Sequence, residues 1–282
     1  MTSPPTPVDS VARGGRRTAL ITGASSGIGW SLAGLFAEGG HDLVLVARRA
    51  EPLQQLASEL RSRHGVVVTV LPADLSVPGA APALVAQLGE RGLHVDILVN
   101  NAGFGIHGDF TAHPLDKWME MIQLNITTLT ALTYLLLPGM RARGFGRIAN
   151  LSSVAGFQAA PSFAVYAATK AFVLSFSEAL REELQPCGIS VTAICPGATR
   201  TEFHQVAGHR DTMLLMFSAS AHEVATESYR AIQAGRGTLV NGWLNKPLPL
   251  LLRFTPRSWA VKIAGRLGRS RPSGAGRASG ST

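Results

Sequence analysis

Short apolar segments rich in β-forming residues alternate with segments of helical pattern along most of this 282-residue chain. Seven segments have the strand pattern: residues 18–21, 42–46, 66–71, 95–99, 147–151, 189–194 and 238–240. Continuous apolar runs of this length are typical of strands buried on both faces, and helices supply the crossovers that parallel strands require. The pattern predicts an α/β fold in which a seven-stranded parallel sheet carries helices on both faces.

The length and the hydrophobic share of 46% are enough for one large core, so we expect a single domain over residues 17–245. Residues 1–16 are rich in Pro, Ser and Thr, and residues 270–282 are rich in Gly, Ser and Arg. Both compositions are typical of disordered segments. A basic helical extension is expected at residues 246–269, between the domain and the C-terminal segment.

A glycine-rich loop, Thr-Gly-Ala-Ser-Ser-Gly-Ile-Gly at residues 22–29, joins the first expected strand to the first expected helix. Backbone N–H groups and the positive end of the helix dipole meet at such a loop and favour an anion, above all a pyrophosphate. Glycine-rich turns also serve close packing, so the loop alone does not decide between a nucleotide site and a packing turn.

Two further strand ends carry residues that suit a nucleotide. Arg48 and Arg49 end the second strand, where an acid would bind the adenosine ribose and a cation suits a 2′-phosphate. We therefore expect NADP(H) rather than NAD(H), with Ser25 joining Arg48 at the phosphate, although paired arginines can also be merely solvated. Asp74 follows the third strand and can either meet the adenine amino group or cap a helix.

Tyr166 and Lys170 are four residues apart, so they share one face if the segment is a helix. A free phenol titrates near 10, and acid–base chemistry near neutral pH requires a cation that stabilises the phenolate. Ser153 follows the fifth strand and can reach the same pocket, and Asn100 and Asn101 follow the fourth. A surface Tyr/Lys pair is the alternative, but the surrounding motifs favour chemistry.

Together these motifs resemble the short-chain dehydrogenase/reductase family in its compact, Rossmann-like, doubly wound single-domain form. The resemblance covers roughly residues 17–240 and rests on Thr22-Gly23-x-x-x-Gly27-x-Gly29, Asn100-Asn101-Ala102-Gly103, Ser153, Tyr166-x-x-x-Lys170 and Pro196-Gly197-x-x-x-Thr201.

The resemblance implies a role for each catalytic residue. Tyr166 would exchange a proton with the substrate oxygen while hydride passes between a nicotinamide and a carbonyl or secondary alcohol, and Ser153 would hold that oxygen. Lys170 would bind the nicotinamide ribose and lower the pKa of Tyr166, and Asn125 would support a water relay to the lysine. It also implies small-molecule substrates, carbonyl reduction as the working direction and a homodimer or homotetramer.

The implied cofactor site comprises Gly23, Ser25, Ser26, Gly27, Ile28, Gly29, Arg48, Asp74, Leu75, Asn101, Ala102, Gly103, Tyr166, Lys170, Pro196, Gly197, Thr199 and Thr201. Residues 202–221 follow it and are rich in Phe, Met and Leu. This segment suggests either a lid over a hydrophobic substrate or a buried structural helix. Two other functions are alternatives to an oxidoreductase: a catalytically silent nucleotide-binding regulator, and a sugar-nucleotide epimerase or dehydratase. Such epimerases and dehydratases usually have a C-terminal domain larger than the about forty residues that follow residue 240 here.

The formal net charge of +8 is concentrated at the C-terminus, because Glu227 is followed by ten Lys/Arg and no Asp/Glu. A helix is expected from Thr255-Pro256 onward, with Trp259, Ile263 and Leu267 forming an apolar stripe beside basic residues. That stripe can pack over the substrate pocket, which we favour, or rest on an anionic membrane. Nucleic-acid binding is not expected without an aromatic platform, and no segment is expected to span a bilayer.

The two cysteines, Cys187 and Cys195, are too few for a disulfide framework and fall in or near an apolar strand pattern. They suit reduced thiols in the cytoplasm, with a membrane-peripheral location if the C-terminal helix rests on a bilayer. The eight histidines are scattered without metal-ligand spacing, so no metal is expected.

Overall fold

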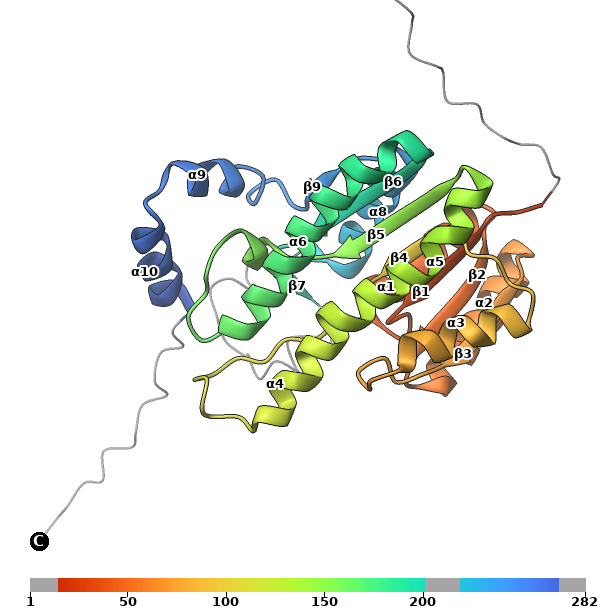
Figure 1. The fold of residues 1–282 in the computed structure, drawn as a ribbon, viewed down its shortest axis with the longest axis horizontal. Helices are drawn as coiled ribbons and strands as arrows, with labels where there is room; N and C mark the ends of the chain where they lie inside the picture. Colours follow the sequence, from red (N-terminus) through yellow and green to blue (C-terminus); the bar gives the residue numbers. More distant parts are fainter. Residues whose placement is uncertain (1–14, 201–218, 269–282) are drawn as a thin grey trace, which may run out of the picture.

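The computed structural model describes residues 15–200 and 219–268, and within them a seven-stranded sheet is flanked by helices (Figure 1). Its strands are β1 Thr18–Thr22, β2 Asp42–Ala47, β3 Val68–Pro72, β4 Ile97–Asn100, β5 Gly146–Leu151, β6 Ile189–Cys195 and β9 Thr238–Val240. They lie in the order β3-β2-β1-β4-β5-β6-β9, and every neighbouring pair is parallel. The predicted fold class is confirmed, with strand ends shifted by up to two residues.

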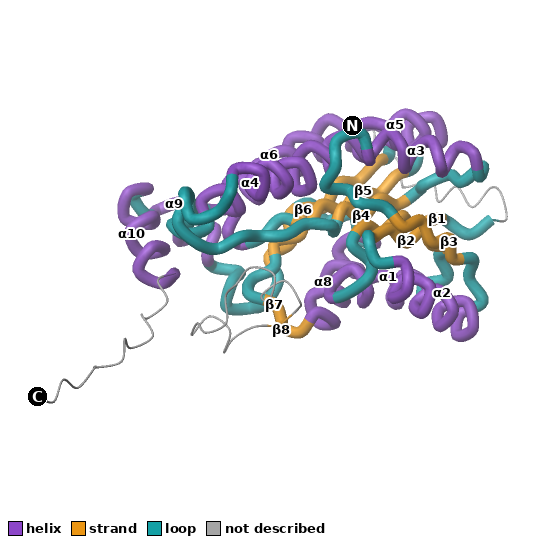
Figure 2. The backbone as a smooth tube through the Cα atoms, turned by 90° about the horizontal axis from the view of Figure 1, so that it is seen from below, coloured by secondary structure: helices purple, strands orange, loops and turns teal. Residues whose placement is uncertain are grey.

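Helices cover both faces of the sheet (Figure 2). One face carries α1 Gly27–Glu38, α2 Ala50–His64 and α8 Ala221–Gln233, and the other carries α3 Ala80–Glu90, α5 Leu129–Arg143 and α6 Ala164–Leu184. The helix α4 Leu115–Ile122 continues into α5 through the π-helical turn η1 Gln123–Thr128. Two 3₁₀ turns, η2 Val154–Phe157 and η3 Gln185–Cys187, and the short pair β7 Thr199–Arg200 with β8 Ala219–Ser220 complete the main body.

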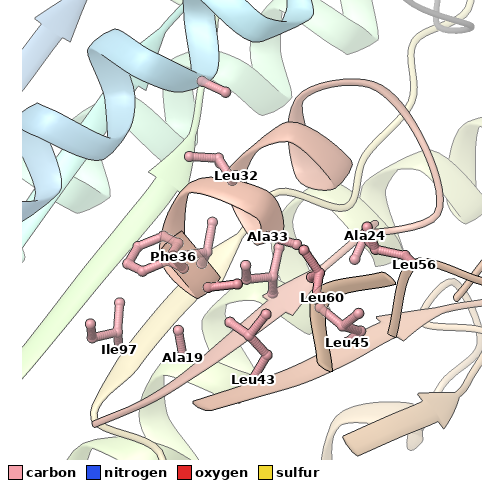
Figure 3. Packing of buried hydrophobic residues seen from close by; sticks show 14 of the residues in the cluster. Ala19, Ala24, Leu32, Ala33, Phe36, Leu43, Leu45, Leu56, Leu60 and Ile97 are labelled. Atoms are coloured by element: carbon pink, nitrogen blue, oxygen red, sulfur yellow. The ribbon is translucent and has the colours of Figure 1, made fainter. Parts of the chain in front are cut away.

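The core follows from strands that are apolar on both sides. On the α1 side, Phe36 and Leu32 pack onto Ala19, Leu43 and residues of α2, all fully buried (Figure 3). A second cluster fills the other face, from Leu20 and Val44 outward to α3, α5 and α6. Burial at both faces fixes the orientation and position of each strand, and therefore the position of the loop that follows it.

The strand order places β1 beside β4, although the chain visits β2 and β3 between them. At this switch point the connections from β1 and β4 leave toward opposite faces, so a crevice opens beyond the carboxyl ends of the strands. Buried amides hold its floor: Asn100 Nδ2 donates to Asn150 Oδ1 at 2.9 Å and to Thr133 Oγ1 at 3.1 Å. These bonds tie β4 to β5 and to α5.

The continuous helix Leu115–Arg143 is, by length and composition, apolar enough to cross a membrane, with a mean hydropathy of 1.3, contrary to the expectation from the sequence. It nevertheless carries the buried polar side chains of Asn125, Thr128 and Thr133. They form hydrogen bonds with α6, with the loop after β3 and with the end of β4, respectively. A membrane span does not need such bonds, so we interpret it as a core helix of the α/β domain.

The described chain begins inside the predicted leader, at residue 15, and ends inside the predicted extension, at residue 268. Arg16, assigned to the leader, forms a hydrogen bond with the carbonyl of Gly65. After β9, the helices α9 Leu248–Phe254 and α10 Arg257–Gly268 form the expected extension at one end of the molecule (Figure 1). The side of α10 that faces the protein is Ala260 and Ala264, with 7% and 9% exposure.

Two members of the predicted apolar stripe of α10 are therefore turned away from the domain. Trp259 is 63% exposed and Ile263 is 50% exposed. Small residues allow a closer approach: a Cβ added to Gly265 would lie 3.1 Å from Pro161 Cγ. Close packing through Ala and Gly thus turns the larger apolar side chains outward.

Candidate active site

A cavity of about 1050 Å³ fills the crevice at the carboxyl ends of the strands. Of the predicted site residues, it is lined by Gly23, Ser25, Ser26, Gly27, Ile28, Arg48, Asp74, Leu75, Asn101, Ala102, Gly103, Ser153, Tyr166, Lys170, Pro196, Gly197 and Thr199. Gly29 and Asn125 lie directly behind the lining, and Thr201 lies outside the described residues. The structure thus brings together residues that are up to 176 positions apart, from Gly23 to Thr199.

The glycine-rich loop is shaped by backbone that other residues rarely adopt. Gly23 and Gly27 have φ values of +67° and +59°. A Cβ on Gly29 would lie 2.4 Å from the carbonyl oxygen of Gly23 and 2.5 Å from Asn101 Nδ2. The first turn of α1 therefore sits close against β1, with its amide groups at the cavity, as an anion site requires.

A side-chain clamp joins this loop to the end of β4. Thr22 Oγ1 accepts hydrogen bonds from the amides of Asn101 and Ala102 at 3.0 and 2.9 Å. Asn101 Nδ2 donates in return to the carbonyl of Thr22 at 2.8 Å. These bonds tie the end of β4 to the end of β1. Thr22 was absent from the expected site, although a hydroxyl at the last position of β1 could have indicated this role.

The two arginines after β2 are exposed and line the cavity. Arg49 Nη2 donates to Ser25 Oγ at 3.4 Å. Arg49 is the N-cap of α2, and Ser25, Arg48 and Arg49 all line the cavity. The expected meeting of Ser25 and Arg48 at a 2′-phosphate stays a prediction.

Asp74 forms a turn with Ser76, whose amide and hydroxyl donate to Asp74 Oδ1 at 2.9 and 2.6 Å. Burial would raise the pKa of Asp74, but these bonds and the charge of Arg48 together lower it below its ordinary value. The residue that caps α3 is Gly79, so the capping role considered for Asp74 is wrong. A charged carboxylate at the cavity wall remains available to a ligand donor.

Ser153 and Tyr166 both line the cavity and are joined by a side-chain hydrogen bond. Ser153 precedes η2, and its Oγ accepts a hydrogen bond from the amide of Ala155 at 3.1 Å. Burial raises the pKa of Tyr166 to about 12, and a side-chain hydrogen bond with Ser153 opposes part of that rise. The lowering that was expected from Lys170 is not present in the protein alone. The Lys170 ammonium lies 5.8 Å from the centre of the Tyr166 ring.

Lys170 is held in place by backbone groups. Its Nζ donates to the carbonyl of Leu151 at 2.7 Å, and the side chain is 5% exposed. Burial lowers the pKa of Lys170 to about 8, while the neighbouring Cys195 acts in the opposite direction. Ser152 Oγ donates to the carbonyl of Lys170 at 2.7 Å, which fixes α6 against the end of β5. Ser152 was not predicted; its position beside Ser153 on a buried strand end is the available signal.

Asn125 lies in the π-helical turn η1 and is 1% exposed. Its amide donates to the carbonyl of Phe104 at 3.0 Å and to Thr169 Oγ1 at 3.1 Å, and its oxygen accepts from the amide of Phe104. The side chain thus pins the loop after β4 to α6, one residue away from Lys170. The water relay expected for Asn125 stays a prediction.

The end of β6 forms the remaining wall. A Cβ on Gly197 would lie 2.2 Å from Asn245 Nδ2, so the Asn245 side chain would have to move if a larger residue stood here. Cys195 is fully buried and burial raises its pKa to about 12, which agrees with the predicted core role. Most of the segment 202–221 lies outside the described residues, apart from β8 and the first residue of α8.

Comparison with known proteins agrees with this geometry. A family model described as short chain dehydrogenase matches residues 17–211, which is more than half of the chain. The protein therefore belongs to the short-chain dehydrogenase family, and its general class is that of an oxidoreductase.

Particular relatives cover most of the chain. Sulfoacetaldehyde reductase 2 of Chromohalobacter salexigens is 42% identical over 187 residues, which are 65% of this chain and 73% of that protein. A solved short-chain dehydrogenase from Sphingobium yanoikuyae in complex with NADPH has a TM-score of 0.77 and 35% identity, covering 93% of this chain and 99% of that one. The bulky-bulky ketone specific alcohol dehydrogenase from Comamonas testosteroni has a TM-score of 0.72 and 32% identity, covering 92% and 97%.

The close approach at Gly29 generates a test of the nucleotide cradle. Gly29→Ala should lower dinucleotide affinity at least tenfold, measured by calorimetry, because its Cβ meets backbone at 2.4 Å. Gly34→Ala on the same helix meets nothing within 4 Å and should leave affinity unchanged while stabilising the fold by about 0.5–1 kcal/mol. Equal affinities in the two variants would contradict the cradle.

The buried Lys170 predicts a pH dependence of stability. Unfolded lysine keeps its proton up to about 10.5, whereas folded Lys170 loses it near 8. The unfolded state therefore binds more protons in this window, and stability rises with pH through it. We expect the unfolding free energy of the wild type relative to Lys170→Met to rise by up to about 3 kcal/mol across it, measured by urea denaturation.

Lys117→Met is the matched control, because a hydrogen bond from Lys117 to Glu120 raises the pKa of this exposed lysine instead. Its difference from the wild type should show no such rise. A flat difference for Lys170→Met would mean that the ammonium is not buried as described.

Proposed function

We propose that the protein is an NADP(H)-dependent oxidoreductase that transfers hydride between the nicotinamide and a carbonyl or secondary alcohol. The observation that carries the proposal is the convergence of Ser153, Tyr166 and Lys170 in the cavity that the glycine-rich loop also lines. A nucleotide cradle alone suits a binding protein, but a proton donor and a buried cation beside it supply chemistry.

The chain's residues fit the cofactor. Gly29 leaves room that a Cβ would fill, and about 1050 Å³ exceeds what a drug-sized ligand alone needs. The turn of Gly23 and Gly27 would hold the pyrophosphate, and Arg48 and Arg49 would hold a 2′-phosphate. The complex of the Sphingobium relative with NADPH supports this choice. Bound there, the nicotinamide would supply or accept the hydride.

The catalytic side chains then have separate tasks. Tyr166, with a pKa of about 12, is protonated at neutral pH and can donate its hydroxyl proton to a carbonyl oxygen. The Ser153 hydroxyl, which is hydrogen-bonded to Tyr166, would orient the carbonyl oxygen of the substrate. Lys170, with a pKa of about 8, is mostly charged at neutral pH, and it lines the same cavity, where it would bind the nicotinamide ribose. Asn125 and Ser152 position the segments that carry these groups.

The substrate we propose is an apolar ketone, with reduction as the working direction. The described wall of the cavity beyond Tyr166 includes Phe104, Ile106, Phe163 and Ala264, which offer little to a polar substrate. The name of the Comamonas relative states a ketone specificity, which supports this substrate class. The name of the Chromohalobacter relative states a reductase activity, which supports the proposed direction.

Removal of the Tyr166 hydroxyl tests the reaction. Tyr166→Phe should bind NADPH normally but lower kcat by about 10²–10⁴-fold in a panel of apolar ketones, followed at the nicotinamide absorbance. Tyr134→Phe is the matched control, because Tyr134 is 74% exposed on α5, and it should behave as the wild type. Undiminished turnover in Tyr166→Phe would refute the assigned role.

The arginines test the cofactor choice. Arg48→Ala and Arg49→Ala should each raise the KM for NADPH about tenfold, because a charged contact to phosphate is lost, and should change the KM for NADH little. Arg63→Ala, which removes an exposed arginine paired with Glu59 at the far end of α2, is the control. A parallel rise for both nucleotides would argue against a 2′-phosphate site.

A further inference from the structure

Large apolar side chains are concentrated on the surface of residues 241–268. Among the described residues, fourteen large hydrophobic side chains are exposed, and seven of them lie in this stretch. We call them the C-terminal patch: Trp243, Leu244, Leu250, Leu251, Phe254, Trp259 and Ile263. Scattered apolar residues are normal on a surface, but a cluster of this kind indicates an interaction site.

The helices α9 and α10, which carry most of the patch, lie together at one end of the molecule, outside the layers that flank the sheet (Figures 1 and 2). Phe254 on α9 and Trp259 on α10 are 78% and 63% exposed. The inner side of α10 is already used, since Ala260 and Ala264 are buried. The patch therefore faces away from the domain and is not the side that packs on it.

Cations are interleaved with the patch. Exposed basic residues of the same stretch are Lys246, Arg253, Arg257, Lys262 and Arg266. The sequence has no acidic residue after Glu227 to neutralise them, and three more arginines follow at 269, 271 and 277. An apolar surface with basic residues among it complements a bilayer that has anionic headgroups above an apolar interior.

We propose that the C-terminal patch docks the protein on the surface of an anionic lipid bilayer. Trp243, Trp259 and Phe254 would enter the interface, where aromatic side chains are favoured, while Lys262 and Arg266 contact headgroups. A second copy of the chain fits this surface less well. A two-fold contact of the patch with itself would bring the five cations of each copy together without an acidic partner from this stretch.

The docking surface adjoins the cavity, because α10 contributes Ala264 to the cavity wall and Ile263 to the patch. Docking on a membrane would thus hold this end of the cavity near the bilayer. The proposal does not depend on the reaction, since it rests on surface residues outside the catalytic set and its test measures lipid binding.

The test is flotation of the full chain with vesicles of phosphatidylcholine alone or mixed with phosphatidylglycerol. We expect binding to the anionic vesicles, weaker binding at high salt and little binding to phosphatidylcholine alone. Lys262→Glu/Arg266→Glu and Phe254→Ser/Trp259→Ser should each lower the affinity at least tenfold. Arg91→Glu/Arg141→Glu, with the same change in net charge, and Val67→Ser, at an apolar side chain 61% exposed, should bind as the wild type.

Circular dichroism establishes that each variant is folded before its binding is compared. Failure of the wild type to bind anionic vesicles would overturn the proposal, as would equal losses in the patch variants and in the Arg91/Arg141 control. Light scattering covers the competing occupant: self-association that only Phe254→Ser/Trp259→Ser abolishes, with vesicle binding unchanged, would make the patch a contact between copies and refute lipid docking.

Discussion

The hydrogen bonds of Thr22 with the amides of Asn101 and Ala102 hold the site together. They join the ends of β1 and β4, the neighbouring strands between which the strand order of the sheet reverses. They fix the distance between the glycine-rich loop after β1 and the chain after β4, and the tight approach of Gly29 to Gly23 depends on that distance. The apolar burial of both sheet faces supplies the stability, and this small polar clamp gives the cavity its shape.

A second constraint is the burial of a charged group at the catalytic end of the site, which costs folding stability. Lys170 is buried, and its lowered pKa is the electrostatic price of taking an ammonium out of water. The bond to the Leu151 carbonyl offsets part of that cost, and the bond from Ser152 to the carbonyl of Lys170 fixes the backbone of α6. A well-packed apolar residue would stabilise the fold better at this position. Perturbed groups of this kind concentrate at functional sites, and the raised pKa of Tyr166 belongs to the same cavity.

Several features were predictable from the sequence because they follow from local pattern: the apolar runs that became the strands, the glycine loop, and the Tyr166/Lys170 spacing on α6. Features that depend on packing were not. The partner of Ser25 depends on how α2 begins, and the outward face of α10 depends on the contact between Gly265 and Pro161. The pKa of Tyr166 depends on burial, which no spacing of residues reveals.

The most direct measurement is the fate of deuterium when NADPH with deuterium at both C4 positions of the nicotinamide converts an apolar ketone. Mass spectrometry of the alcohol should find one deuterium on the carbinol carbon, and none should enter that position from deuterated water. Direct hydride transfer from cofactor to substrate, the central claim, requires this result. Retention of both deuterium atoms in the nucleotide while the substrate changes, or hydrogen that comes from solvent, would contradict the account and favour epimerase-like chemistry.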